Sequence, residues 1–166
     1  MGWRGILPAV RPGLGGFFPG QAAVPGETAN PVDGLSFLKE RIPAYADYGD
    51  EDARHLVDKQ VRAYVGEALS TIRERLAADL IQNVSEQLEK TLLMCEFSNQ
   101  QLIHMLDHAK LSNTEIEELH EVDHELIQVA DRANAIEAAK LDTYLSELTE
   151  LFARRAQAVF WSEDRR

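Results

Sequence analysis

Residues that interrupt regular structure are almost missing from most of this chain. All six prolines lie at or before Pro43, and nine of the ten glycines lie at or before Gly49. Residues 67–166 contain neither glycine nor proline. Because these two residues are the main breakers of helices and strands, this stretch favours long helices.

Cysteine and long apolar runs are also scarce. Cys95 is the only cysteine, which excludes an intramolecular disulfide and fits a reducing compartment. It recurs with the apolar positions of its helix, so we interpret it as a small buried hydrophobe. No stretch approaches the ~20 apolar residues of a membrane span, and Pro8 interrupts the apolar run at residues 5–10. We therefore expect a cytoplasmic protein without a membrane span.

Basic residues are outnumbered by acidic ones. The formal net charge is −11, and residues 111–150 contain eleven Asp or Glu against only Arg132 and Lys140. An acidic surface repels the phosphates of nucleic acids and of anionic lipids, so neither is expected as a partner. The acidic run at residues 115–125 is typical of a solvated helix face, and docking of a basic protein is the alternative interpretation.

Residues 1–34 have a different composition and predict an extended N-terminal arm. Their glycines and prolines exclude a long helix, and their charges sum to zero. Unlike a solvated linker, the arm holds large apolar side chains: Trp3, Ile6, Leu7, Val10, Leu14, Phe17 and Phe18. It is either a disordered leader with stray hydrophobes or an arm that docks these side chains on another subunit, and we expect the second.

Residues 35–166 predict an all-α domain. After a short helix that ends at Pro43, apolar residues recur at helical spacing from about Asp50 to Ala109. The weakest positions of this long helix are residues 83–85 and 98–99.

The clear break in the helical pattern lies at residues 111–114. Ser112 with Glu115, and Thr114 with Glu117, both match a capping box, and a second long helix then runs to about Phe160. Two long helices joined by a short turn fold back on each other, so we expect a long antiparallel helical hairpin.

Both expected helices also carry apolar residues outside their main apolar face. These residues are Tyr64, Ile81, Leu93, Phe97, Ile103, Ile127 and Leu145. Two helices cannot enclose a core, so we expect oligomerisation, as a homodimer or higher, to complete a helical bundle, with a larger hetero-complex as a further option. Phe160 and Trp161 near the C-terminus either seal the hairpin or help to form a groove for a partner.

Four histidines form the one constellation that resembles a site. His104 with His108, and His120 with His124, are i,i+4 pairs on the two helices, and Glu117 and Glu121 each lie three residues before a histidine of the second pair. Imidazole and carboxylate groups can bind zinc, nickel or iron, and the hairpin would place His104 nearly opposite His120.

The helical angles argue against a buried metal site. At 100° per residue, His104 and His108 fall opposite the apolar face, and His120 and His124 fall at its boundary or outside it. We therefore favour a solvated face, and a surface or intersubunit metal site is the alternative.

Recognised catalytic motifs are missing. The sequence has no Gly-rich phosphate loop, Gly-x-Ser-x-Gly, Cys-x-x-Cys or His-Glu-x-x-His. We predict a non-enzymatic helical scaffold, adaptor or accessory subunit that needs no cofactor. It would bind partner proteins through the arm residues together with Leu93, Phe97, Phe160 and Trp161. The alternative is a metal-binding helical bundle, for storage or redox, that uses the four histidines with Glu117 and Glu121.

Overall fold

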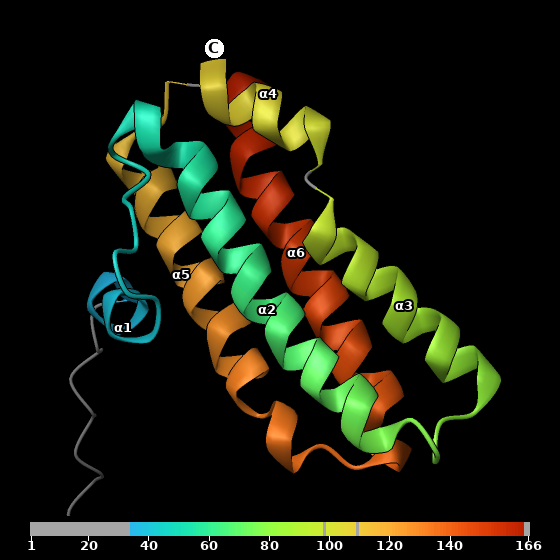
Figure 1. Cartoon of the computed structure of the whole chain (residues 1–166). Helices are drawn as coiled ribbons and strands as arrows, with labels where there is room; N and C mark the ends of the chain where they lie inside the picture. Colours follow the sequence, from blue (N-terminus) through green and yellow to red (C-terminus); the bar gives the residue numbers. More distant parts are fainter. Residues whose placement is uncertain (1–33, 98, 109, 165–166) are drawn as a thin grey trace, which may run out of the picture. The chain divides into compact units, whose positions relative to one another are not determined.

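The computed structural model describes residues 34–97, 99–108 and 110–164, with side chains up to Val159. Within these residues every regular element is helical, which confirms the all-α prediction (Figure 1). The α-helices are α1 (Gly34–Arg41), α2 (Arg54–Leu76), α3 (Gln82–Glu96), α4 (Gln100–His108), α5 (Asn113–Asp131) and α6 (Leu141–Asp164). Short 3-10 turns are η1 (Glu51–Ala53), η2 (Ala133–Ala135) and η3 (Ala138–Lys140). Among the described residues, none of the helices combines the length and the apolar composition that a membrane span requires.

Each of the two long helices expected from the sequence is divided in the structure. The first is divided at residues 77–81 and again between Glu96 and Gln100, and the second is divided at residues 132–140. Ile81 and Phe97 both adopt extended backbone conformations, with ψ of 153° and 124°. Of the two weak positions in the sequence, the one at residues 98–99 coincides with a break, where the Asn99 side chain accepts hydrogen bonds from the backbone of α4.

The breaks allow several helices of one chain to enclose a hydrophobic core. α2 packs against α3 and α5, and α6 packs against α5, α3 and α4. Val61 and Leu69 of α2 and Leu148 of α6 are completely buried in this core. Ile127 and Leu145, which lie outside the main apolar faces, are also completely buried. Their burial within one chain requires no second copy, and oligomerisation stays a prediction.

The start of α5 is fixed by its local sequence. The Ser112 hydroxyl accepts a hydrogen bond from the Glu115 backbone N–H (3.3 Å), and the Glu115 carboxylate accepts one from the Ser112 N–H (2.6 Å). Of the two capping boxes that the sequence offers, the structure forms this one. It satisfies backbone donors that the first turn of a helix would otherwise leave unpaired.

The capping box predicts unequal effects for two neighbouring substitutions. Ser112→Ala should lower the free energy of unfolding by about 1 kcal/mol, because it removes the cap. Thr114→Ala, an exposed position inside α5, should change it by no more than a few tenths of a kcal/mol. Urea unfolding followed by circular dichroism measures both, and equal losses would show that Ser112 does not cap the helix in solution.

Candidate protein-docking groove

A buried guanidinium lies where three helices meet. Arg155 of α6 is only 1% exposed. Its Nε donates to Asp123 of α5 (2.7 Å), its Nη1 to Asp58 of α2 (2.5 Å) and its Nη2 to the Tyr48 hydroxyl (2.6 Å). Burying an unpaired charge costs several kcal/mol, so Arg155 can lie in the core only because these acceptors pair with it. We call Arg155, Asp58, Asp123, Tyr45 and Tyr48 the buried polar network.

The two tyrosines come from the turn that follows α1. Ala44 has a φ of 59°, a left-handed conformation that turns the chain after Pro43. Gln60 of α2 holds this turn from the side: its amide donates to the Ala44 carbonyl (2.9 Å) and accepts from the Ala46 N–H (3.1 Å). The turn thus directs Tyr45 and Tyr48 inward, where both hydroxyls donate to the same Asp123 oxygen, at 3.2 and 2.6 Å.

Electrostatics and burial oppose each other in this network. Burial disfavours the Arg155 charge, but Asp123, Tyr48 and Asp58 outweigh burial and hold the pKa of Arg155 well above its ordinary value. Burial raises the pKa of the Asp123 carboxyl, against the effect of Arg155, so this carboxylate depends on the guanidinium for its charge. Burial also raises the pKa of Tyr45 and of Tyr48, so both remain neutral donors.

A second arginine links the network to the end of α3. Arg62 of α2 donates from Nε to Asp58 (2.8 Å) and from Nη1 to the Cys95 carbonyl (2.8 Å), near the C-terminus of α3. The last carbonyls of a helix have no partner within the helix and carry partial negative charge, so a cation there stabilises the helix end. Arg62 therefore helps to end α3 at Glu96, and Phe97 follows in an extended conformation.

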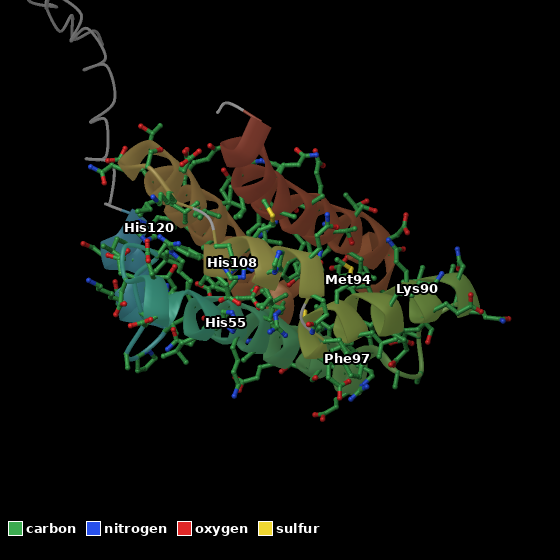
Figure 2. All side chains as sticks on the ribbon, turned by 90° about the horizontal axis from the view of Figure 1, so that it is seen from above. His55, Lys90, Met94, Phe97, His108 and His120 are labelled. Carbon is green, nitrogen blue, oxygen red and sulfur yellow. The ribbon has the colours of Figure 1, made fainter. Side chains whose placement is uncertain are left out.

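An apolar groove lies beside this helix end. It has a volume of about 400 Å³ and runs between α3, the start of α4, and α6. Its apolar walls are formed by Leu93, Met94, Phe97, Leu102, Phe152 and Ala156, and Lys90, Asn99 and the network side chains Asp58, Arg62 and Arg155 complete the lining. Figure 2 shows Lys90, Met94 and Phe97 on the α3 side of the molecule, away from His120.

The groove leaves large apolar side chains in contact with solvent. Phe97 is 65% exposed, Leu93 51% and Met94 40%. The sequence predicted Leu93 and Phe97 as partner-binding residues, and the structure brings them together with Met94. Met94 was not predicted as part of a site, and none of the network residues was predicted as part of a docking surface. The only signal was that Asp58, Asp123 and Arg155 recur at the spacing of the core positions in their helices.

The four histidines do not form one cluster. His104 and His108 are exposed and lie edge to face, with ring centroids 4.6 Å apart. His124 packs instead against Phe37 of α1, with ring centroids 4.4 Å apart. His55 of α2, which was not considered as a site residue, pairs with Asp107.

His120 contradicts the angular argument that placed it at or beyond the edge of the apolar face. It is 8% exposed, because α1 packs on α5 and the turn with Tyr45 and Tyr48 also lies against His120. Its Nε2 lies 3.2 Å from an Asp47 carboxylate oxygen, close enough for an ion pair when His120 is protonated but without hydrogen-bond geometry.

The described histidines and carboxylates do not come together as a set of metal ligands. In the part of the chain that the structure describes, no group of three or more His, Cys, Asp or Glu side chains could hold a metal ion. Glu117 and Glu121 are exposed on α5.

Several predicted partner-binding residues lie outside the described residues. These are the arm residues Trp3, Ile6, Leu7, Val10, Leu14, Phe17 and Phe18, and the side chains of Phe160 and Trp161. Their binding role and the domain boundary at residue 34 stay predictions.

Comparisons with protein-family models, with curated proteins and with solved structures found no match for this chain.

The buried polar network predicts unequal losses of stability for substitutions of two adjacent arginines. Arg155→Met should lower the free energy of unfolding by about 3–5 kcal/mol, because it leaves Asp58 and Asp123 buried without the guanidinium. Arg154→Met removes an exposed pair with Glu125 and should cost less than about 1 kcal/mol. Urea denaturation curves compare the two variants, and equal losses would contradict a dominant role for the network.

Burial also predicts the chemistry of the single thiol. Cys95 is 7% exposed, and burial, opposed by Arg62, raises its pKa to about 12. At pH 8 the reactive thiolate is then rare, so iodoacetamide should label native protein at least ~100-fold more slowly than unfolded protein. Mass spectrometry of timed samples with and without denaturant measures this ratio. Comparable rates in both states would mean that Cys95 is accessible in the native fold.

Proposed function

We propose that this chain is a non-enzymatic helical adaptor or accessory subunit that binds partner proteins through the apolar groove. The observation that carries the proposal is the exposure of Leu93, Met94 and Phe97 beside one another in the wall of that groove. Contiguous exposed apolar side chains mark interaction sites, because their burial by a partner removes them from water.

The composition of the groove suits a protein partner. Aromatic residues and methionine are enriched at the centres of protein interfaces, and charged residues are depleted there. Phe97, Met94 and Phe152 provide this kind of surface, and Lys90 provides a charged edge. Phe97 and Leu93 stand out into solvent, so each could insert between side chains of a partner and contribute on the order of 1.5–3 kcal/mol when fully buried.

The buried polar network supports a structural role for its own charged groups. Arg155, Asp58 and Asp123 are each at most 1% exposed and donate to or accept from one another and from Tyr48. Groups held in this way keep the helices rigid, and a rigid scaffold lowers the entropy that a binding surface loses when it meets a partner.

The N-terminal arm would add a second attachment to partner subunits. Its apolar residues, Trp3 and the Phe17–Phe18 pair above all, would each contribute on the order of 2–3 kcal/mol if a neighbouring subunit buried them. We infer that the chain works in an assembly, as a homo-oligomer or together with different subunits. Phe160 and Trp161 are further candidates for such contacts.

The test compares the groove with exposed apolar residues elsewhere. The full chain, carrying a small affinity tag, is purified with its bound proteins from the cells that make it. Leu93→Glu with Phe97→Glu should remove any stoichiometric partner, because the partner would have to bury two carboxylates. The matched control, Leu56→Glu with Ile81→Glu, changes two residues of similar exposure outside the groove and should keep the partner.

Thermal unfolding of both double variants ensures that they are compared as folded proteins. If the groove variant keeps its partner, or if the control variant loses it equally, the groove is not the docking surface.

A further inference from the structure

The chemistry of the groove indicates what kind of segment it accepts. Resting on the proposed function, we propose that its occupant is an amphipathic helix of a partner protein, with apolar residues at i, i+3 or i+4, and i+7 and an acidic residue that meets Lys90. Three features carry this inference: the backbone of the groove walls, their length and their charge.

The first feature is that helices form the walls. α2, α3, α4 and α6 contribute every lining residue except Phe97 and Asn99, which lie between α3 and α4. The helical backbone N–H and C=O groups are used within the helices or by caps, such as Arg62 at Cys95 and Asn99 at α4, and the Phe97 N–H donates to the Leu93 carbonyl (2.9 Å). An extended peptide would therefore find no strand edge in the described lining and would lose water from its own backbone groups. A helix satisfies these groups internally, so it can enter an apolar groove at no such cost.

The second feature is the length of the wall. Lys90 and Phe97 are seven residues apart on α3 and at its end, with Leu93 and Met94 between them. At 1.5 Å per residue this is about 10 Å, or two helical turns. Apolar residues at i, i+3 or i+4, and i+7 of a partner helix span the same length, so three anchors can face the wall together.

The third feature is charge. The groove is lined by the cations Arg62, Lys90 and Arg155 and by a single carboxylate, Asp58. Asp58 is 1% exposed and accepts hydrogen bonds from both arginines, so no carboxylate of the lining faces an occupant. In a chain with net charge −11, this is a local departure from the acidic surface.

Lys90 is the cation that a partner can reach. It is exposed and makes no ion pair within the described residues, and Glu86 one turn earlier accepts from Gln82 instead (3.0 Å). Arg62, by contrast, is used by Asp58 and the end of α3. A carboxylate on the partner helix therefore pairs with Lys90 at the α3 edge of the groove, while the apolar anchors lie against Leu93, Met94 and Phe97. A second copy of this chain is a less suitable occupant, because two copies that each carry a net charge of −11 repel each other.

The test uses two synthetic, helix-stabilised peptides with the same leucine stripe at i, i+3 and i+7. One carries glutamates beside the stripe and the other carries lysines. Fluorescence anisotropy with the full-length protein should show the glutamate peptide binding at least about tenfold more tightly.

Lys90→Glu should abolish or reverse this preference, because it reverses the charge at the groove edge. Lys39→Glu, which changes an exposed lysine of α1 outside the groove lining, should leave the preference unchanged. Phe97→Ala should weaken both peptides, because it removes an apolar anchor site.

Equal binding of the two peptides, binding of neither, or a preference insensitive to Lys90→Glu would overturn the proposal. If that happens while Leu93→Glu with Phe97→Glu still removes the cellular partner, docking at the groove stands and only the acidic helix is wrong. Sedimentation of the protein alone decides the case of a second copy: a dimer that dissociates on Leu93→Glu with Phe97→Glu would also overturn the proposal.

Discussion

The placement of the Arg155 guanidinium in the core constrains four described segments of the chain at once. Arg155 can be buried only where Asp58, Asp123 and Tyr48 surround it, because a buried charge without partners costs several kcal/mol. These acceptors come from α2, α5 and the turn after α1, so the requirement fixes the positions of three separate segments around α6. Hydrophobic burial provides most of the stability but is not directional. The hydrogen bonds of the network are directional, so they fix how these segments are positioned against one another.

The same interaction extends to the surface. Asp58 accepts from Arg155 with one oxygen and from Arg62 with the other, and Arg62 donates to the carbonyl of Cys95. α3 ends one residue later, and Phe97 leaves the helix in an extended conformation. Arg62 therefore connects the exposed apolar wall of the groove to the buried polar network. A change in the network would alter both the stability of the core and the geometry of the proposed binding surface.

Local signals in the sequence predicted the helical class, the short helix before Pro43, the weak position at residues 98–99 and the start of α5, but they missed the breaks at residues 77–81 and 132–140. The Ser112–Glu115 capping box is complete within four residues, so the sequence alone can reveal it. The breaks at residues 77–81 and 132–140 contain no glycine or proline. Contacts between residues that are distant in the sequence stabilise them. Arg75 at the end of α2 donates to the carbonyls of Ala133 and Ile136, which lie 58 and 61 residues further along the chain. Such a contact exists only in the folded protein, and helix propensity is a weak guide where tertiary contacts compete with it.

The candidate site, too, could be predicted only in part from the sequence. Leu93 and Phe97 were singled out because they lie off the main apolar face, yet Ile127 and Leu145 share that property and are completely buried. The difference depends on how many helices enclose the core: Ile127 and Leu145 belong to the core that several helices share, whereas Leu93 on α3 is 51% exposed. An off-face apolar residue is thus ambiguous until the number of helices is known. Charged residues at core spacing are less ambiguous, since Asp58, Asp123 and Arg155 could hardly be buried apart from one another. Their pattern would have predicted a shared network, and with it the close packing of α2, α5 and α6.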